Sequence, residues 1–142
     1  MKNSDLVIMT KTQKIIYWVA TVVLVFGLLA SGIQQLLRLE VEGALAPPFA
    51  WGIVKLGYPV YVLTILGMWK LLGAVAIVIP KYPLLKEWAY AGIFFLFSGA
   101  LFSHYASGHI WLEFIPATTL LMMTILSWYF RPADKKLSRP KA

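Results

Sequence analysis

The sequence predicts an all-α integral membrane protein, an up-down-up-down four-helix bundle with both termini in the cytoplasm. Three observations lead to this fold class. Hydrophobic residues make up 60% of the 142 positions and charged residues only 13%, against about 25% charged in a typical soluble domain. Several apolar runs are long enough to cross a hydrocarbon layer about 30 Å thick. Lysine and arginine gather in the segments that lie on one side of these runs.

Four apolar runs are predicted to cross the membrane, at residues 15–37, 58–79, 88–106 and 110–130. Their apolar character is continuous and they are too long for barrel strands, which favours helices. They form one transmembrane domain over residues 15–130, after an N-terminal tail at 1–14. A basic tail at 131–142 follows, and we expect the part after Arg131 to be disordered because it is rich in charge and proline.

The first span has to be distinguished from a secretory signal peptide, because Lys11 and Lys14 precede an apolar core that ends near residues 30–32. A cleaved signal has an apolar core of about 7–15 residues. Here apolar residues resume at Ile33 and continue to Leu37. We therefore favour an uncleaved first span.

The connections differ in length. Residues 82–87, entered through Pro80, form a compact turn, and residues 107–109 form a tighter one, so neighbouring helices should be antiparallel. The connection at 38–57 is longer. Pro47-Pro48 breaks any continuous helix within it, and residues 50–56 suit a short amphipathic element in the membrane interface.

Basic residues predict the orientation. Ten of the 13 lysines and arginines fall in the two tails and in the connection between the second and third spans, whereas Arg38 and Lys55 lie on the opposite side. Positive residues mark the cytoplasmic side, so both termini are expected there. The net charge of +7 then fits anionic lipid head groups rather than nucleic acid, for which no motif is present.

Lys70 stands near the middle of the second span, in the stretch LGMWKLLG. The residues that share its face on a helix are Leu66, Gly67, Gly73 and Ala74. Three of these are small, and small residues mark faces where helices approach closely, so Lys70 is predicted to point into the bundle. Two interpretations stay open. Lys70 either bonds backbone carbonyls and fixes helix register, or it binds a ligand, a lipid or a proton.

Polar residues of the other spans are candidates to line a site with Lys70: Gln34, Gln35, Ser98, His104, Glu113 and Thr118. Glu113 is the only acid predicted inside a span, and it precedes Pro116, a potential kink point. Counted along the helices, Lys70 lies about 18 Å from the outer end and Glu113 about 5 Å. A water-filled cavity open to the outer side therefore competes with a direct ion pair.

Catalytic and metal sites are not predicted. His104, His109 and Glu113 have the spacing H-x4-H-x3-E, but a glycine-containing turn does not fix ligand geometry and zinc sites show tighter signatures. The absence of cysteine excludes thiol chemistry and Fe–S ligation by the chain itself. The small-residue pairs Gly27-x3-Ser31 and Gly99-x3-Ser103 favour close helix contact within the bundle over a homodimer face.

The order of several motifs resembles the DoxX-like family of small four-span membrane proteins. The matching pieces, within residues 15–132, are Gly57-Tyr58-Pro59, the block LGMWKLLGAVAIVIP, KEWAYAG at 86–92, Gly99-Ala100, Ser103-His104 with Gly108, and Arg131-Pro132. After Gly108 the family usually has an acid, where this chain has His109. A cation site is therefore not carried over to that position.

The resemblance implies a multi-pass protein of the bacterial cytoplasmic (inner) membrane with links to redox systems. Some relatives are tied to thiosulfate oxidation with quinone as acceptor, others to membrane complexes that detoxify radicals, and distant animal relatives to membrane-protein assembly. We expect an accessory or ligand-binding subunit that takes a quinone or a lipid and contacts a partner membrane or redox protein. The alternatives are a quinone-linked membrane oxidoreductase and a small proton-coupled transporter. The sequence does not predict the oligomeric state.

Overall fold

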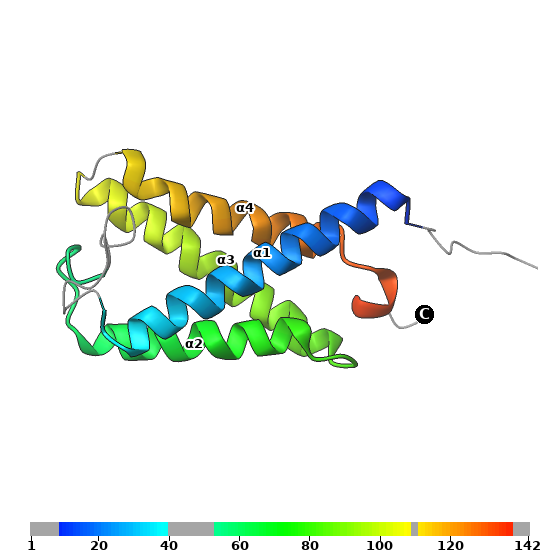
Figure 1. Ribbon diagram of the computed structural model, residues 1–142, viewed down its shortest axis with the longest axis horizontal. Coiled ribbons are helices and arrows are strands. Elements are labelled where there is room, and N and C mark those ends of the chain that lie inside the picture. The colour runs from blue at the N-terminus through cyan, green and yellow to red at the C-terminus, as the bar shows by residue number, and fades with distance from the viewer. Residues whose placement is uncertain (1–8, 40–52, 109–110, 138–142) are drawn as a thin grey trace, which may run out of the picture.

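The computed structural model describes residues 9–39, 53–108 and 111–137. Within these ranges the chain is helical and has no strand. The elements are α1 (Lys11–Leu36), α2 (Tyr61–Val78), α3 (Pro83–Ala106), η1 (Trp111–Phe114), α4 (Ile115–Tyr129) and η2 (Ala133–Lys135), where η marks a short 3-10 helix (Figure 1). Pro47-Pro48, His109 and part of the predicted interfacial segment at 50–56 lie outside the described residues.

The long helices confirm the predicted all-helical class. Four candidate spans in the described part are long and apolar enough to cross a membrane, and the fourth combines η1 with α4. Their boundaries differ from the predicted ones mainly at two helix starts. α1 begins at Lys11 because Thr10 and Gln13 form a capping box, in which the Gln13 N–H donates to Thr10 Oγ1 at 3.2 Å and the Thr10 N–H to Gln13 Oε1 at 3.0 Å.

The third helix also starts earlier than predicted. α3 begins at Pro83, where the fixed proline backbone suits the first turn of a helix and no N–H is lost from the helix ladder. The turn between α2 and α3 is therefore shorter than the predicted 82–87 segment. Lys81 in this turn adopts a positive φ of 71°, a conformation that non-glycine residues rarely take.

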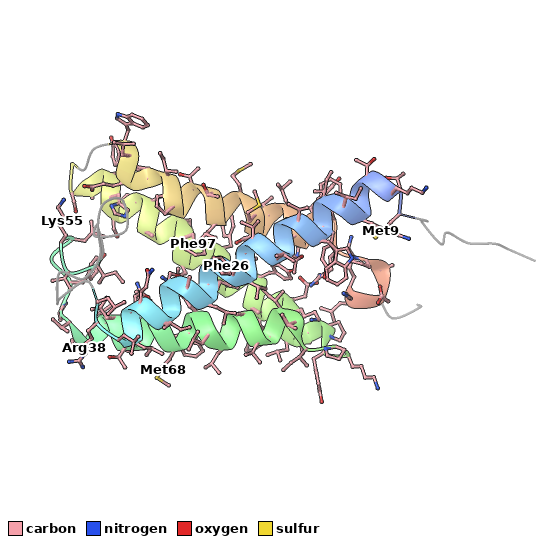
Figure 2. All side chains as sticks on the ribbon, viewed as in Figure 1. Met9, Phe26, Arg38, Lys55, Met68 and Phe97 are labelled. Atoms are coloured by element: carbon pink, nitrogen blue, oxygen red, sulfur yellow. The ribbon has the colours of Figure 1, made fainter. Side chains whose placement is uncertain are left out.

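The helices pack so that α1 contacts α2 and α4, and α3 contacts the same two helices. In Figure 1 the ends of α1 and α3 lie on the left with the starts of α2 and α4, and the opposite helix ends lie on the right. We call these the Gln35 end and the Arg131 end. Figure 2 shows Arg38 and Lys55 at the Gln35 end and Met9 at the other.

An apolar core runs between the helices. Its buried members are Leu24 and Leu28 of α1, Ala74 and Ile77 of α2, Tyr90, Ile93 and Phe97 of α3, and Ala117 of α4. Large apolar side chains also cover the outside, as at Met68, which points away from the bundle in Figure 2. So much exposed apolar surface suits a chain whose solvent is lipid.

Small residues set the distance between α1 and α2. A Cβ placed on Gly67 would lie 2.9 Å from the carbonyl oxygen of Gly32, so the face shared with Lys70 is a close helix contact, as predicted. Gly27 likewise packs against Leu120 of α4. The predicted close contact at Gly99 is wrong, because a Cβ there would meet no atom within 4 Å.

The segment after α4 is more ordered than predicted. Arg131 is buried and bonds the Glu87 carboxylate of α3. Lys135 in η2 donates to the Tyr17 hydroxyl at 3.3 Å and lies 5.0 Å from the centre of the Trp18 ring. The expectation of a disordered tail is therefore wrong for residues 132–137, which fold back onto the start of α1.

Candidate functional site

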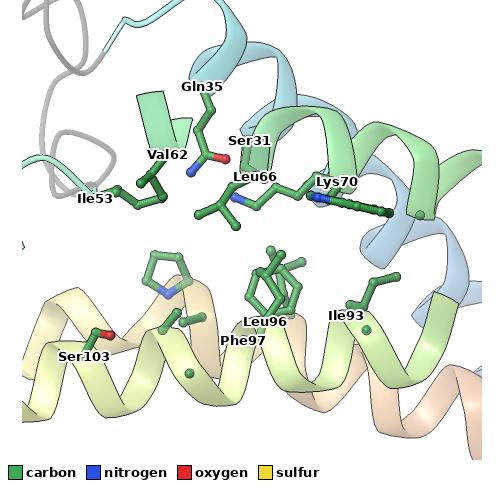
Figure 3. Close-up of a pocket in the computed structure, with 18 of the residues that line it drawn as sticks. Ser31, Gln35, Ile53, Val62, Leu66, Lys70, Ile93, Leu96, Phe97 and Ser103 are labelled. Atoms are coloured by element: carbon green, nitrogen blue, oxygen red, sulfur yellow. The ribbon is translucent and has the colours of Figure 1, made fainter. Parts of the chain in front are cut away.

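A cavity of about 790 Å³ opens between the helices at the Gln35 end and continues along the groove between α2 and α3 (Figure 3). Its size falls in the range of small-molecule sites, about 300–1,000 Å³. Five of the seven residues proposed from the sequence line it: Gln34, Gln35, Lys70, His104 and Glu113.

The other two proposed residues do not line the cavity. Thr118 follows the buried Ala117 and is exposed on the outer face of α4. Ser98 is half-buried, and its hydroxyl donates to the Phe95 carbonyl of its own helix at 3.2 Å. Both are one position away from a core residue, and a single position rotates a side chain by about 100° around a helix.

Lys70 is held in the bundle interior, with only 7% of its surface exposed. Gly67, one turn earlier on the same face of α2, packs closely against α1. The Lys70 side chain therefore leaves α2 next to a close contact between these two helices. In Figure 3 the Lys70 side chain extends into the cavity on the side where Gln35 and Ser31 of α1 lie. An ammonium group at this depth is costly in a membrane and is commonly a functional group.

Glu113 contacts two other polar residues at the polar end of the cavity. It is buried at 5% exposure in η1, and its Oε1 accepts from Lys55 Nζ at 3.2 Å. Its Oε2 lies 3.9 Å from Nδ1 of the buried His104. A second contact joins Tyr58, which precedes α2, to Ser103 of α3. Their hydroxyl oxygens lie 3.0 Å apart. Lys55 was not proposed from the sequence, where it served only as a charge marker.

Gln35 offers an acceptor at the same end. Its side chain is buried at 6% exposure and lines the cavity. Its Oε1 has no hydrogen-bond partner among the described residues. A buried polar atom left unsatisfied is costly, so this oxygen is suited to accept from a ligand hydroxyl or from water.

The opposite part of the cavity is apolar and reaches the bundle surface. Trp69 and Leu72 of α2 and Trp88 of α3 line it and are themselves more than half exposed. Gly92 and Gly99 of α3 also line the cavity, and a Cβ on either would meet no atom within 4 Å. The groove between α2 and α3 is therefore open along these glycines and continuous with the surface that faces lipid.

A second polar cluster, at the Arg131 end, was missed in the sequence. The fully buried Ser127 hydroxyl lies 2.7 Å from Thr21 Oγ1 and 2.7 Å from the Tyr90 hydroxyl, which joins α1, α3 and α4. Lys86 is buried and donates to the Ile77 carbonyl near the end of α2. The hydroxyl-bearing residues within the spans can be seen in the sequence. The sequence around each of them does not indicate that they contact one another in the bundle.

An ion pair belongs to the same cluster. The Glu87 carboxylate accepts from Arg131 through Oε1 and from Trp128 Nε1 through Oε2, the latter at 2.8 Å. The Arg131 guanidinium also lies over the Tyr90 ring, 5.3 Å from its centre. In the sequence, Arg131 counted as one of the charges that orient the chain and as part of the Arg131-Pro132 motif, but it was not proposed as a buried group.

No metal-binding group of three histidine, aspartate or glutamate side chains occurs among the residues that the structure describes. His104 and Glu113 of the H-x4-H-x3-E pattern do approach each other. The third member, His109, lies outside the described ranges.

Comparison with known protein families gives a match over most of the chain. The model of the DoxX-like family matches residues 19–127, which include the cavity residues from Ser31 to Leu120. Arg131 lies beyond the matched range. No curated protein and no solved structure matches the chain.

Proposed function

The chain is a multi-pass membrane protein of the DoxX-like family, and from this premise we propose that it binds an amphipathic, lipid-like ligand in the cavity between its helices. In this role it serves as an accessory subunit of a membrane redox or assembly system. The ligand's polar head lies near Lys70 and its apolar tail lies in the groove between α2 and α3.

The form of the cavity carries this proposal. One end gathers buried polar side chains, with Lys70 and His104 as donors and Gln35 as an acceptor. The other end is an apolar groove with open space at Gly92 and Gly99. A soluble metabolite would leave the groove empty, and a pure hydrocarbon would offer no hydrogen bond to Gln35 Oε1. An amphipathic molecule meets both requirements.

Lys70 supplies the charge that selects the head group. Its ammonium group can donate to a carbonyl, carboxylate or phosphate oxygen, and each such bond is stronger in the low dielectric of the bundle. The competing role is structural, in which Lys70 bonds backbone carbonyls and fixes helix register. If Lys70 binds the ligand, replacing its ammonium group should release the ligand. If Lys70 only fixes helix register, the ligand should be retained.

The tail reaches its place from the bilayer. Trp69 and Trp88 stand on either side of the groove and are mostly exposed, at 64% and 74%. A ligand dissolved in the membrane can therefore enter between α2 and α3 without crossing the polar end. Lateral access of this kind suits a molecule that is too apolar to arrive through water.

We assign the bundle to the bacterial cytoplasmic membrane, with up-down-up-down spans and both termini in the cytoplasm. The positive-inside rule supports this orientation, because ten of the 13 lysines and arginines fall on the side of the two tails. The Arg131 end then faces the cytoplasm. Glu113 then lies in the outward-facing half of the bundle, and Lys70 lies near its middle.

A quinone is a specific member of the proposed ligand class. Its ring carbonyls accept hydrogen bonds, and two cavity residues on different helices, Lys70 and His104, can donate them. Its apolar tail suits the groove. A quinone-linked oxidoreductase is therefore the second candidate function, and it requires that electrons come from a partner subunit, because the chain has no cysteine of its own.

The experiment is to purify the protein in a mild detergent and to identify, by mass spectrometry, what co-purifies with it. We expect one lipid-like molecule at near-stoichiometric amount, and its loss in Lys70→Met. The matched control is Met68→Leu, which changes an outward-facing side chain on the same helix. Retention that is equal in the two variants would support the structural role of Lys70. Proton-dependent uptake by liposomes would instead favour transport.

A further inference from the structure

A second cavity, of about 570 Å³, lies at the Arg131 end, apart from the α2–α3 groove. Its wall joins the start of α1, through Met9 and Gln13, to the end of α4 and the segment after it. Arg131 and Lys136 are the positive side chains in the wall, and Glu87 is the negative one. None of these residues belongs to the ligand site proposed above.

Arg131 is the unusual group in this wall. It is 3% exposed, and one of its terminal nitrogens, Nη2, donates to Glu87 Oε1. The other two nitrogens, Nε and Nη1, are buried without a hydrogen-bond partner among the described residues. A guanidinium presents its N–H groups in a planar fork that matches the oxygens of phosphate or carboxylate.

Glu87 does not fill this fork. One of its carboxylate oxygens accepts from Arg131 Nη2 and the other from Trp128 Nε1. Two positive side chains therefore face one negative side chain whose oxygens are both engaged. The wall keeps a positive balance, which favours an anion.

The start of α1 also favours an anion. The start of α1 forms part of the wall, and the first N–H groups of a helix carry partial positive charge. The end of α4 carries the opposite partial charge, but Lys136 Nζ donates to the Tyr129 carbonyl at 3.3 Å and offsets it there.

The rim of the cavity lies at an aromatic belt. Trp128 and Tyr129 line it and are 46% and 65% exposed, and such rings favour the level of lipid head groups. Lys136 and Leu137, on the other part of the rim, are exposed. The buried guanidinium lies below this rim, so an anion that reaches it has to displace the exposed Leu137, while Lys136 stays at the rim.

We propose that Arg131, Lys136 and Gln13 form a binding site for a phosphate group at this end of the bundle. The phosphate belongs either to the head group of an anionic lipid or to a free phosphate ion, and the two share the same chemistry. A bound oxygen accepts from an N–H of the Arg131 guanidinium that has no partner among the described residues, and Lys136 supplies the second charge. This site is independent of the ligand cavity near Lys70.

The test uses the full chain in detergent with three added probes: phosphatidylglycerol, phosphatidylcholine and inorganic phosphate. Native mass spectrometry counts bound lipid, and thermal unfolding reports the effect of phosphate. We expect phosphatidylglycerol to be retained over phosphatidylcholine, and Lys136→Gln to weaken this retention about fivefold. The matched control is Lys14→Gln, an exposed lysine of α1 outside the cavity wall, which should retain the lipid as the wild type does.

Arg131→Gln should abolish the preference for phosphatidylglycerol over phosphatidylcholine. If the Arg131→Gln protein does not fold, the comparison of Lys136→Gln with the wild type still tests the proposal. A rise in melting temperature with inorganic phosphate that is lost in Lys136→Gln, without lipid selectivity, would identify free phosphate as the ligand. Equal losses in Lys136→Gln and Lys14→Gln would show only diffuse surface charge and would overturn the proposal. The proposal is also overturned if neither lipid nor phosphate distinguishes Lys136→Gln from the wild type.

Discussion

Gly32 of α1 and Gly67 of α2 face each other so closely that a Cβ on Gly67 would lie 2.9 Å from the Gly32 carbonyl oxygen. This contact lies one helical turn from Lys70. It presses the two backbones together and holds the Lys70 face of α2 against the bundle interior. The position of the buried lysine therefore depends on a residue that has no side chain.

Gly67→Leu should consequently destabilise the bundle. The added side chain has no space against the Gly32 backbone and must push α1 and α2 apart, at a cost of about 1–3 kcal/mol or more. The control is Gly92→Leu, because a Cβ at Gly92 meets no atom within 4 Å. Thermal unfolding in the same detergent should show a lower melting temperature for Gly67→Leu only. Equal melting temperatures would mean that the two helices do not meet at this point.

Gly99→Leu should reduce ligand retention without reducing stability. Gly99 lines the α2–α3 groove and has open space above it, so a leucine there fills the room that the ligand tail would occupy. Ala91→Leu is the control, since Ala91 is exposed on the same helix and does not line the cavity. Quantifying the co-purified molecule checks this. If Gly99→Leu retains as much ligand as Ala91→Leu, the tail does not lie in the groove.

Ser127→Ala should weaken the packing of three helices at once. Its fully buried hydroxyl lies within hydrogen-bond distance of Thr21 on α1 and Tyr90 on α3. Loss of these bonds is expected to cost about 1–2 kcal/mol of unfolding free energy. In the control, Ser98→Ala removes a hydroxyl that bonds only within its own helix and should change stability by less than about 0.5 kcal/mol. A Ser127 variant as stable as the Ser98 variant would contradict the buried network.

Lys81→Gly should stabilise the protein. Lys81 has a φ of 71° in the turn between α2 and α3, a conformation that costs an L-residue about 1–2 kcal/mol and glycine much less. Part of the gain is offset by the greater freedom of glycine in the unfolded chain. A higher melting temperature for Lys81→Gly than for Lys81→Ala checks this. The opposite order would show that the turn is not strained at this position.

The sequence predicted the features that depend on one helix at a time. Continuous apolar runs predicted the spans, and the small residues around Lys70 predicted that it faces inward, since both follow from helical periodicity. Gln35, His104 and Glu113 were grouped with Lys70 because they are polar residues within the other spans. Depth along a span can also be counted from the sequence, and this count places Glu113 nearer the outer end than Lys70.

Features that depend on how helices meet could not be predicted. Ser98 and Thr118 lie at suitable depths, but each helix is rotated so that Phe97 and Ala117 occupy the interior instead. The pairing of Arg131 with Glu87 joins residues 44 positions apart. No local pattern distinguishes such a buried pair from two surface charges, because burial is decided by tertiary packing.

A structure of the protein in lipid, purified without removal of what it binds, tests the central claim most directly. We predict an elongated molecule in the cavity, with its polar head within hydrogen-bond distance of Lys70 Nζ and its tail between Trp69 and Trp88. A cavity that holds only water beside Lys70, or a Lys70 side chain that points out into the acyl chains, would contradict it.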